Sequence, residues 1–270
     1  MPVVSILMPN FNCDKYIGAA ISSVLSQTFT NFELLIIDNG STDSSLSQIA
    51  KFEDRRIKLL RCERRGARFA LNMGIEESKG DYIARIDADD IYHPLKVEKQ
   101  VIQLKERPEF GVCYTDGWVM NDSGISTGSI RSRSIIGSSP EFDRGEVFKL
   151  LLKTDFLIGA SLMARKDLLR KENFDESLHV ADDWSLALRL AKMTRFKCIE
   201  EPLYGYRYRR QMTSSFSNML ANSYNLTAAM VKWMRTIDMS RDEKLRLLET
   251  LALGPSKMVY TVIRRRRGEI

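Results

Sequence analysis

The chain has 270 residues, which is enough for one large domain or for one domain with an appendage. Hydrophobic residues make up 44% and charged residues 28%, a balance that excludes a disordered or fibrous protein. No run of about 18 apolar residues occurs, so we expect no membrane-spanning segment. The N-terminus lacks the basic start of a signal peptide, and we expect a cytoplasmic protein.

The formal net charge is +6, and the four cysteines are far apart without a C-x-x-C pattern. We therefore expect reduced cysteines and no zinc site. The basic residues include a C-terminal cluster of Arg264, Arg265, Arg266 and Arg267. This cluster is either a solvated tail or a peripheral contact with the anionic inner face of the plasma membrane, worth roughly 1 kcal/mol per basic residue. No nucleic-acid motif accompanies it, so we expect no nucleic-acid partner.

Strands and helices are predicted to alternate over the first 120 residues. The apolar and amphipathic patterns predict, in order, strand 3–8, helix 15–26, strand 32–37, helix 42–52, strand 57–62, helix 67–78, strand 82–86, helix 94–105 and strand 110–120. Continuous apolar strands that alternate with helices are typical of a parallel sheet covered on both faces. The predicted fold class is therefore α/β, with a mostly parallel central sheet.

The pattern is less regular after residue 120. A long polar loop is predicted over 122–145, and a helix over 147–152, a buried strand over 156–164 and an amphipathic helix over 182–193 follow. Two strands, 196–200 and 203–208, come next. Two helices between 215 and 263, interrupted near 238–240, complete the chain. We expect one domain over 1–214 and a helical extension with the basic tail over 215–270.

Polar and acidic side chains follow three of the predicted strands. The clearest segment is Gly80-Asp-Tyr-Ile-Ala-Arg-Ile-Asp-Ala-Asp-Asp90, where a short apolar strand ends in three carboxylates. The first strand ends in Pro9-Asn-Phe-Asn12 and the second in Asp38-Asn-Gly-Ser-Thr-Asp43. Because parallel strands place their C-terminal ends at one edge of a sheet, we expect these segments to meet in one crevice. Asp-x-Asp is an oxygen ligand set that suits Mg²⁺ or Mn²⁺, although such a cluster also serves as a cap and turn.

Five blocks together carry a family resemblance. They are Ser5-Ile-Leu-Met-Pro-Asn-Phe-Asn12, Ile36-Ile-Asp-Asn-Gly-Ser-Thr-Asp43, Ala70-Leu-Asn-Met-Gly-Ile75, the Gly80 to Asp90 segment and Ala181-Asp-Asp-Trp184. In this order and spacing, over roughly residues 3–215, the chain resembles the GT-A inverting glycosyltransferases of family 2, a large bacterial group that builds polysaccharides and lipopolysaccharides. The resemblance implies a GT-A fold with a nucleotide-binding half at about 1–120 and an acceptor half at about 121–214.

The resemblance assigns a nucleotide site to the first half. It places Asp38 at the base, typically at the N3–H of uracil, and Pro9, Phe11 and Asn12 around the base and ribose. It places Arg68 at the diphosphate or the base. Structural alternatives remain open, because Asp38 can cap a helix, the Pro9 segment can be a plain turn, and Arg68 can be solvated.

The acidic segment matches the Asp-x-Asp motif of the family. Asp89 is expected to ligate Mn²⁺ or Mg²⁺ through the diphosphate, and Asp87 to hold the ribose or the sugar and to share the metal site. Asp90 is expected either to bind the donor sugar or to tie down the metal loop. The motif therefore implies a divalent metal cofactor.

A second acidic pair, Asp182 and Asp183, stands where the family has Glu-Asp. The resemblance makes Asp183 the general base, with Asp182 as the other candidate. The structural alternative is that both acids stabilise the positive end of a helix dipole. Trp184 and Gly159 are expected at the acceptor site or, equally, in the core.

Basic residues near the end of the domain complete the predicted site. Arg207 and Arg209 are expected to steady the diphosphate, and Arg209 stands where many family members have a histidine. That departure argues against a histidine metal ligand.

The resemblance implies a metal-dependent, non-processive, inverting transferase. It would move one hexosyl or N-acetylhexosaminyl group from a nucleotide-diphosphate sugar, typically a UDP-sugar, to a hydroxyl of a glycan or lipid-linked glycan. A polyprenyl-phosphate glycosyltransferase and a degenerate carbohydrate-binding scaffold are the alternatives. The Q-x-x-R-W element of processive synthases, a nucleotidyltransferase glycine loop and a P-loop are all missing.

Overall fold

The computed structural model describes residues 1–130, 141–142, 144–153, 157–178, 181–208 and 216–252. The elements in chain order are β1 (Val4–Asn10), α1 (Ile17–Leu25), β2 (Phe32–Asp38), α2 (Ser45–Ile49), β3 (Ile57–Arg61), α3 (Ala67–Glu77), β4 (Tyr82–Arg85), β5 (Ile91–Tyr92), α4 (Lys96–Glu106), β6 (Phe110–Met120), β7 (Ser126–Ile130), β8 (Glu141–Phe142), α6 (Arg144–Lys153), the 3₁₀ turn η1 (Gly159–Ser161), β9 (Met163–Arg165), α7 (Lys166–Lys171), α8 (Asp182–Met193), β10 (Arg195–Arg207), α9 (Phe216–Thr236) and α10 (Arg241–Ala252).

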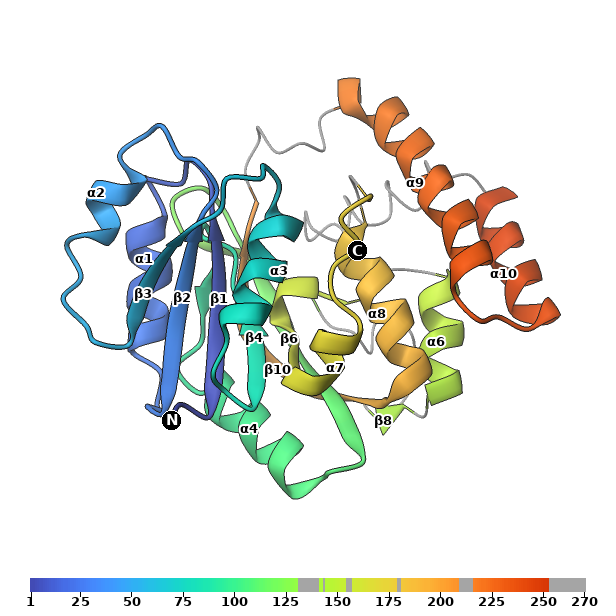
Figure 1. Ribbon diagram of the computed structural model, residues 1–270, viewed down its shortest axis with the longest axis horizontal. Coiled ribbons are helices and arrows are strands. Elements are labelled where there is room, and N and C mark those ends of the chain that lie inside the picture. Colours follow the sequence, from blue (N-terminus) through green and yellow to red (C-terminus); the bar gives the residue numbers. More distant parts are fainter. Residues whose placement is uncertain (131–140, 143, 154–156, 179–180, 209–215, 253–270) are drawn as a thin grey trace.

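One sheet organises the described part of the chain (Figure 1). Its strand order is β3-β2-β1-β4-β9-β6-β10-β5, with β7 beside β6 and β8 beside β10. Strands β1 to β4 run parallel, and β6 runs parallel to β10. The short strand β9 is antiparallel to both of its neighbours, β4 and β6. The predicted α/β fold with a mostly parallel sheet is confirmed.

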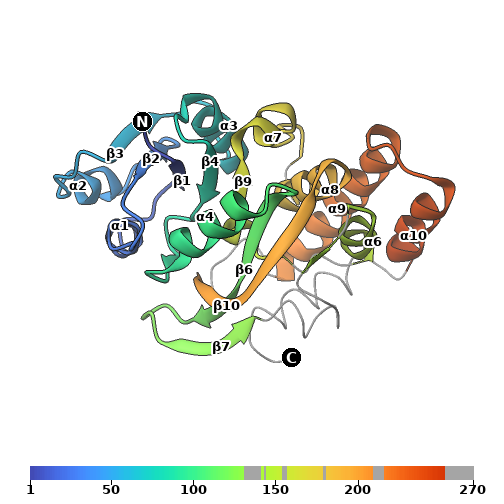
Figure 2. The ribbon, with the colours of Figure 1, turned by 90° about the horizontal axis from the view of Figure 1, so that it is seen from below.

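Helices cover both faces of this sheet, as the view from below shows (Figure 2). Side chains of α1 and α4 share one buried cluster with Ile6 and Met8 of β1. Side chains of α3, α6, α7 and α8 share the other cluster with Leu7. Successive residues of a strand point to opposite faces, so burial on both faces requires the continuous apolar run that the sequence has. All four cysteines are free and buried, as expected.

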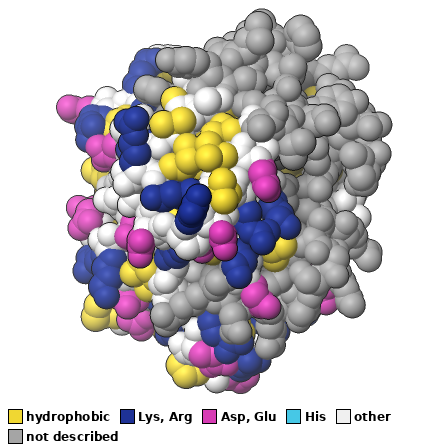
Figure 3. All heavy atoms as spheres, turned by 90° about the vertical axis from the view of Figure 1, so that its right-hand side faces the viewer, with side chains coloured by type: hydrophobic (Ala, Val, Ile, Leu, Met, Phe, Trp, Pro, Cys, Tyr) yellow, Lys and Arg dark blue, Asp and Glu magenta, His cyan; other side chains and the backbone are white. Residues whose placement is uncertain are grey.

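The C-terminal helices α9 and α10 share the second of these cores. Trp233 of α9 packs edge-to-face on Trp184 of α8, with ring centroids 5.1 Å apart. The Thr250 hydroxyl of α10 donates a hydrogen bond to the Leu152 carbonyl of α6 at 3.0 Å. Figure 3 shows hydrophobic and basic side chains side by side on this face of the molecule, and Leu245 and Leu248 of α10 are exposed. None of the described helices combines the length and apolar character needed to cross a bilayer.

Three local predictions are wrong. The polar segment 122–145 is not a continuous loop, because its described parts form β7, β8 and the start of α6. The segment 156–164 is not a strand, because Gly159–Ser161 turns as a 3₁₀ helix before the short strand β9. The two strands predicted over 196–200 and 203–208 are one strand, β10 (Arg195–Arg207), because it stays paired with β6 through register shifts around Pro202.

Candidate active site

The nucleotide residues predicted from the sequence lie together at the ends of β1 and β2. Asp38 is buried, and its Oδ1 accepts a hydrogen bond from Asn10 Nδ2 at 2.9 Å. Its Oδ2 accepts from the backbone N–H groups of Gly40 and Ser41, both at 3.2 Å. Asp38 therefore stabilises the loop after β2 and does not cap α2, which begins only at Ser45. Asn10 Oδ1 is buried without a partner among the described residues, and no role was predicted for this residue.

The loop after β1 is exposed at Phe11 and Asn12. Asn12 adopts the left-handed conformation with φ 51°, which asparagine tolerates better than most residues. Its Oδ1 accepts the Thr42 N–H at 2.8 Å, so the loops after β1 and β2 are joined. Phe11 is 44% exposed, and the Arg65 guanidinium lies 5.1 Å from its ring centre. Pro9 belongs to β1, opposite Ile37, so the predicted turn begins after it.

Arg68, in the first turn of α3, contacts residues from the second half of the chain. Its Nε donates to the Glu176 carbonyl at 2.8 Å, and its guanidinium lies 4.5 Å from the Phe69 ring centre. Arg68 thus connects α3 with the loop that follows α7.

The acidic loop after β4 carries the three predicted carboxylates. Asp87 accepts two hydrogen bonds on Oδ1, from Arg85 Nε at 3.1 Å and Nη2 at 2.9 Å. Asp90 is only 2% exposed and accepts from the Tyr204 hydroxyl at 2.6 Å and the Arg207 N–H at 2.7 Å. Burial, and then the nearby Asp89 and Asp87, raise the pKa of Asp90 well above its usual range. Of the two roles expected for Asp90, these contacts correspond to tying down the loop.

Arg207, the last residue of β10, contacts the acidic loop. It is 4% exposed, and its Nε donates to the Asp89 carbonyl at 2.7 Å. Its Nη1 donates to the carbonyls of Asn121 and Asp122 at 3.1 and 3.0 Å. The guanidinium thus donates to backbone oxygens on both segments and holds the Asp89 loop against the β6–β7 turn. Arg209 lies outside the described residues.

The second acidic pair opens helix α8. Asp182 Oδ1 accepts the Asp183 N–H at 3.0 Å, and Asp183 Oδ1 accepts the Trp184 N–H at 2.8 Å. Ala181, just before them, adopts φ 57°, a strained conformation for a residue with a side chain. Burial and the neighbouring Asp183 raise the pKa of Asp182, and Arg85 opposes this shift. Both carboxylates lie at the positive end of the α8 dipole and stabilise the helix there. This structural role is compatible with a catalytic role for either acid.

Gly159 and Trp184 differ in their relation to this pair. Gly159 lies directly against the Asp183 carboxylate, and a Cβ added there would be 2.9 Å from the Asp183 Cβ. Trp184 is buried, and its Nε1 donates to the Leu151 carbonyl at 2.9 Å. Of the two positions expected for Trp184, these contacts correspond to the core position, because the indole lies between α6 and α9.

Arg85 is the charged group that sequence reasoning missed. Burial works against its charged form, but the carboxylates of Asp87, Asp183 and Asp182 together raise the pKa of Arg85. The guanidinium therefore stands in the field of the acidic loop and of the α8 acids at once. The sequence feature that could have revealed it is a single arginine at the end of an otherwise apolar strand.

The sequence matches the family model described as "Glycosyl transferase family 2" over residues 5–172. The chain belongs to glycosyltransferase family 2. A relative from Haemophilus influenzae, an uncharacterized glycosyltransferase, is 30% identical over 241 residues, 86% of this chain and 72% of that protein. An uncharacterized glycosyltransferase of Rickettsia felis is 32% identical over 202 residues, 74% of this chain and 32% of that protein.

A relative with a specific name is WfgD of Escherichia coli, a UDP-Glc:alpha-D-GlcNAc-diphosphoundecaprenol beta-1,3-glucosyltransferase. It is 40% identical over 125 residues, 46% of this chain and 49% of that protein. The chain therefore spans about a third of the length of the Rickettsia relative and about half that of WfgD.

Two solved structures share the fold. TarS from S. aureus in complex with UDP-GlcNAc has a TM-score of 0.70 at 18% identity, and the match covers 93% of this chain and 72% of that chain. The mannosyltransferase PcManGT from Pyrobaculum calidifontis, in complex with GDP-Man and Mn²⁺, has a TM-score of 0.67 at 19% identity, covering 93% and 69%. The predicted GT-A fold of this family 2 chain is confirmed.

The acidic loop fits a divalent ion only together with a substrate. Among the residues that the structure describes, no group of three or more His, Cys, Asp or Glu side chains is arranged as a metal site. Mg²⁺ is usually held by one or two carboxylates together with substrate phosphates. Asp87 and Asp89 fit that incomplete ligand set, in which a diphosphate would supply the remaining oxygens.

Proposed function

We propose that the chain is a metal-dependent, non-processive, inverting glycosyltransferase. It transfers one sugar from a nucleotide-diphosphate sugar, most simply a UDP-sugar, to a hydroxyl of a glycan or lipid-linked glycan. The observation that carries the proposal is the juxtaposition of two acidic groups around one guanidinium. Asp87, after β4, pairs with Arg85, whose charge also interacts with the acids at the start of α8.

The donor crevice lies at the ends of β1 and β2. Asp38 and the unpartnered Asn10 Oδ1 supply acceptors for the imide N–H of a base, and the exposed Phe11 ring supplies a stacking face. A carboxylate that accepts from an N–H makes a charge-assisted hydrogen bond, which is stronger than a neutral one. The UDP-Glc specificity in the name of WfgD and the UDP-GlcNAc complex of TarS support a UDP-sugar.

The acids at α8 act on the acceptor. Asp183 takes the proton of an acceptor hydroxyl as that oxygen attacks the anomeric carbon of the donor sugar. The new carbon–oxygen bond forms as the bond to the β-phosphate oxygen breaks, and the electron pair leaves with the nucleoside diphosphate. When bound at Asp89 and Asp87, a divalent ion would offset the charge of that leaving group. Asp182 accepts the Asp183 N–H and so positions the base.

Nucleotide binding tests the donor half of the proposal. A thermal-shift panel of UDP, GDP, CDP and dTDP, each with and without Mn²⁺, measures stabilisation of the native state, which is about 2.7 kcal/mol at about 100 times Kd. A shift that depends on Mn²⁺ and on one base is expected. No shift with any nucleotide would contradict the proposal.

Substitution at α8 tests the catalytic half. Asp183→Asn is expected to abolish transfer while nucleotide affinity stays within about threefold, because the base touches the acceptor and not the nucleotide. The matched control is Asp242→Asn, which removes an acid from the first turn of α10. Helix α10 has 12 residues, the same length as α8. If both variants keep wild-type turnover, Asp183 serves only the helix dipole and is not the base.

We also propose that the protein is cytoplasmic and works at the anionic inner face of the plasma membrane, where a lipid-linked acceptor would be found. The residues expected to make that contact, Arg264, Arg265, Arg266 and Arg267, lie outside the described residues. The exposed Leu245 and Leu248, with exposed Arg241 and Lys244 on the same helix, support it. Deletion of the four arginines should weaken binding to anionic liposomes and leave turnover of a soluble acceptor unchanged.

A further inference from the structure

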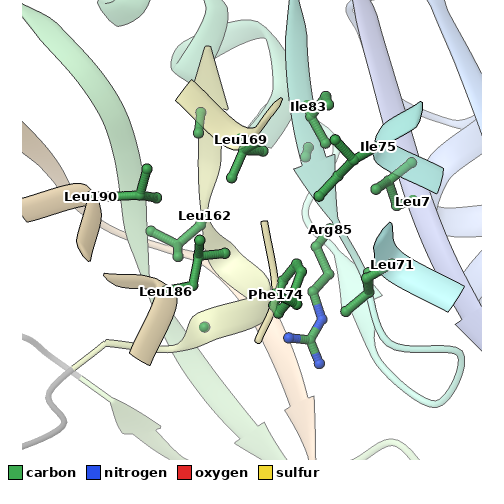
Figure 4. Close-up of a pocket in the computed structure, with 13 residues that line it drawn as sticks. Leu7, Leu71, Ile75, Ile83, Arg85, Leu162, Leu169, Phe174, Leu186 and Leu190 are labelled. Carbon is green, nitrogen blue, oxygen red and sulfur yellow. The ribbon is translucent and has the colours of Figure 1, made fainter. Parts of the chain in front are cut away.

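The side chain of Arg85 stands at the end of a strand, above an apolar cavity (Figure 4). Alternation along β4 places it on the same sheet face as Ile83, with Leu7 of the neighbouring strand β1. The cavity has a volume of about 30 Å³, and Arg85 carries the only polar side chain among the described residues that line it. In Figure 4 the guanidinium points away from the labelled leucines Leu162, Leu169 and Leu190.

One nitrogen of this guanidinium is left without a partner. Nε and Nη2 both donate to Asp87 Oδ1, whereas Nη1 is buried and makes no hydrogen bond to any described residue. Buried donors in native proteins are almost always paired, so a buried N–H without a partner calls for a ligand or an ordered water. A water in the cavity below would meet apolar walls and one nitrogen, whereas a buried water needs two to four polar partners.

The position of the unpaired nitrogen identifies its ligand. On one side of the guanidinium is Asp87, at a separation of 2.9 Å. Gly159 lines the same cavity as Arg85 and lies directly against the Asp183 carboxylate, whose charge also acts on the guanidinium. In the proposed function the group between the donor acids and the general base is the transferred sugar, because the base activates the hydroxyl that attacks its anomeric carbon.

We propose that Arg85 Nη1 binds a hydroxyl oxygen of the transferred sugar. Both hydrogen bonds from Arg85 to Asp87 fall on Oδ1, which leaves Oδ2 to accept from a sugar hydroxyl. A hydroxyl can donate to Asp87 and accept from Arg85 at once, so the ion pair recognises one correctly placed hydroxyl. The pair therefore acts as a specificity element for the sugar, and this inference rests on the proposed function.

Calorimetric titration of the purified full chain tests the assignment with UDP, UDP-glucose, UDP-N-acetylglucosamine and GDP-mannose, each with Mn²⁺. Arg85→Met should weaken the preferred nucleotide sugar at least about tenfold, because a hydrogen bond from a charged donor is lost. The affinity for the free nucleotide should stay within about threefold. Arg85→Lys keeps the charge but cannot hold Asp87 and a sugar hydroxyl together, so it should lose the same selectivity.

Arg189 provides the matched control. It is ion-paired with Glu172 through Nη1 and has a 19% exposed side chain, against 17% for Arg85. Its Nε is also buried without a partner among the described residues, and its other two guanidinium nitrogens donate to Glu172 and Asn173 rather than to the acidic loop. Arg189→Met should cost similar stability and leave both affinities unchanged.

Each outcome separates this inference from the proposed function. If Arg85→Met lowered the affinities for nucleotide and nucleotide sugar equally, Arg85 would contact the phosphates and the sugar assignment would be overturned. Unchanged affinity for both ligands would also overturn it and leave Arg85 structural, whereas the proposed function would stand if Asp183→Asn still abolished transfer. Absence of any nucleotide-sugar binding by the wild-type chain would overturn both.

Discussion

Gly159→Ala probes how closely the general base is held. A Cβ at this position would lie 2.9 Å from the Asp183 Cβ and 3.0 Å from its Cγ, and closer still to Oδ2. Carbon atoms in favourable contact are about 3.5–4.0 Å apart, so the carboxylate would have to withdraw by roughly 0.5–1 Å. Gly159 does not have positive φ, so alanine itself is compatible with the backbone there.

The size of the effect follows from that displacement. A misplacement of about 1 Å in a reacting group costs up to about 100-fold in rate, so we expect kcat to fall between about 10- and 100-fold. The assay is release of nucleoside diphosphate in the presence of acceptor, with nucleotide affinity measured in parallel. Affinity should be unchanged, because the base lies on the acceptor side of the proposed site.

A second glycine supplies the control for overpacking. A Cβ on Gly111, at the start of β6, would lie 2.8 Å from the Thr194 Cβ, a clash of the same size at a distance from the acids. Gly111→Ala should lower the free energy of unfolding by about 1–3 kcal/mol and leave kcat unchanged. If Gly159→Ala kept wild-type kcat, or if Gly111→Ala lost as much activity, the proposed placement of the base would be refuted.

Three further predictions concern the metal loop and the buried charges. Asp89→Ala should remove the gain in UDP affinity on adding Mn²⁺, and an unchanged response in calorimetry would place the ligand elsewhere. Tyr204→Phe removes a hydrogen bond to buried Asp90 and should lower the free energy of unfolding by about 1–3 kcal/mol in urea titrations; an unchanged value would contradict the contact. Burial lowers the pKa of Lys96 to about 7, so above that pH the unfolded chain binds more protons and the stability contributed by this site rises with pH. The stability of Lys96→Met relative to wild type should therefore be greatest near or below pH 7 and should decline by about pH 9; a difference that does not change with pH would refute this.

Much of the fold could be read from the sequence where burial and periodicity agree. The helix predicted over 182–193 and the strand predicted over 110–120 have those bounds in the structure, because the first has a clear amphipathic period and the second is a mostly apolar, buried run. The segment 156–164 failed because apolar residues near Gly159 are buried in a turn, and burial without alternation does not define a strand. The two-residue strand β5 was missed because so short a run carries no period.

The site was predicted in part. Motif residues near the ends of elements could be recognised from the sequence: Asp38 ends β2, Asp87 follows β4 and Asp183 lies in the first turn of α8. The partners of these acids could not be predicted, since Tyr204 and Arg207 reach the acidic loop from more than a hundred residues away. The roles of Arg85 and Trp184 depended on which way each side chain points, and tertiary packing decides that.

The antiparallel strand β9 has a consequence for how the protein is made. Strands β1 to β4 and β6 have been synthesised by residue 120, yet β4 and β6 flank a gap that only Met163–Arg165 fills. Until that segment leaves the ribosome, two open strand edges face each other, which is a hazard for association with other nascent chains. The residues just before β9 form η1, which sets Gly159 beside Asp183. The same late step therefore fills the gap between β4 and β6 and sets Gly159 where Asp183 of α8 later meets it, so a chain stalled before it would have neither a continuous sheet nor a complete acceptor side.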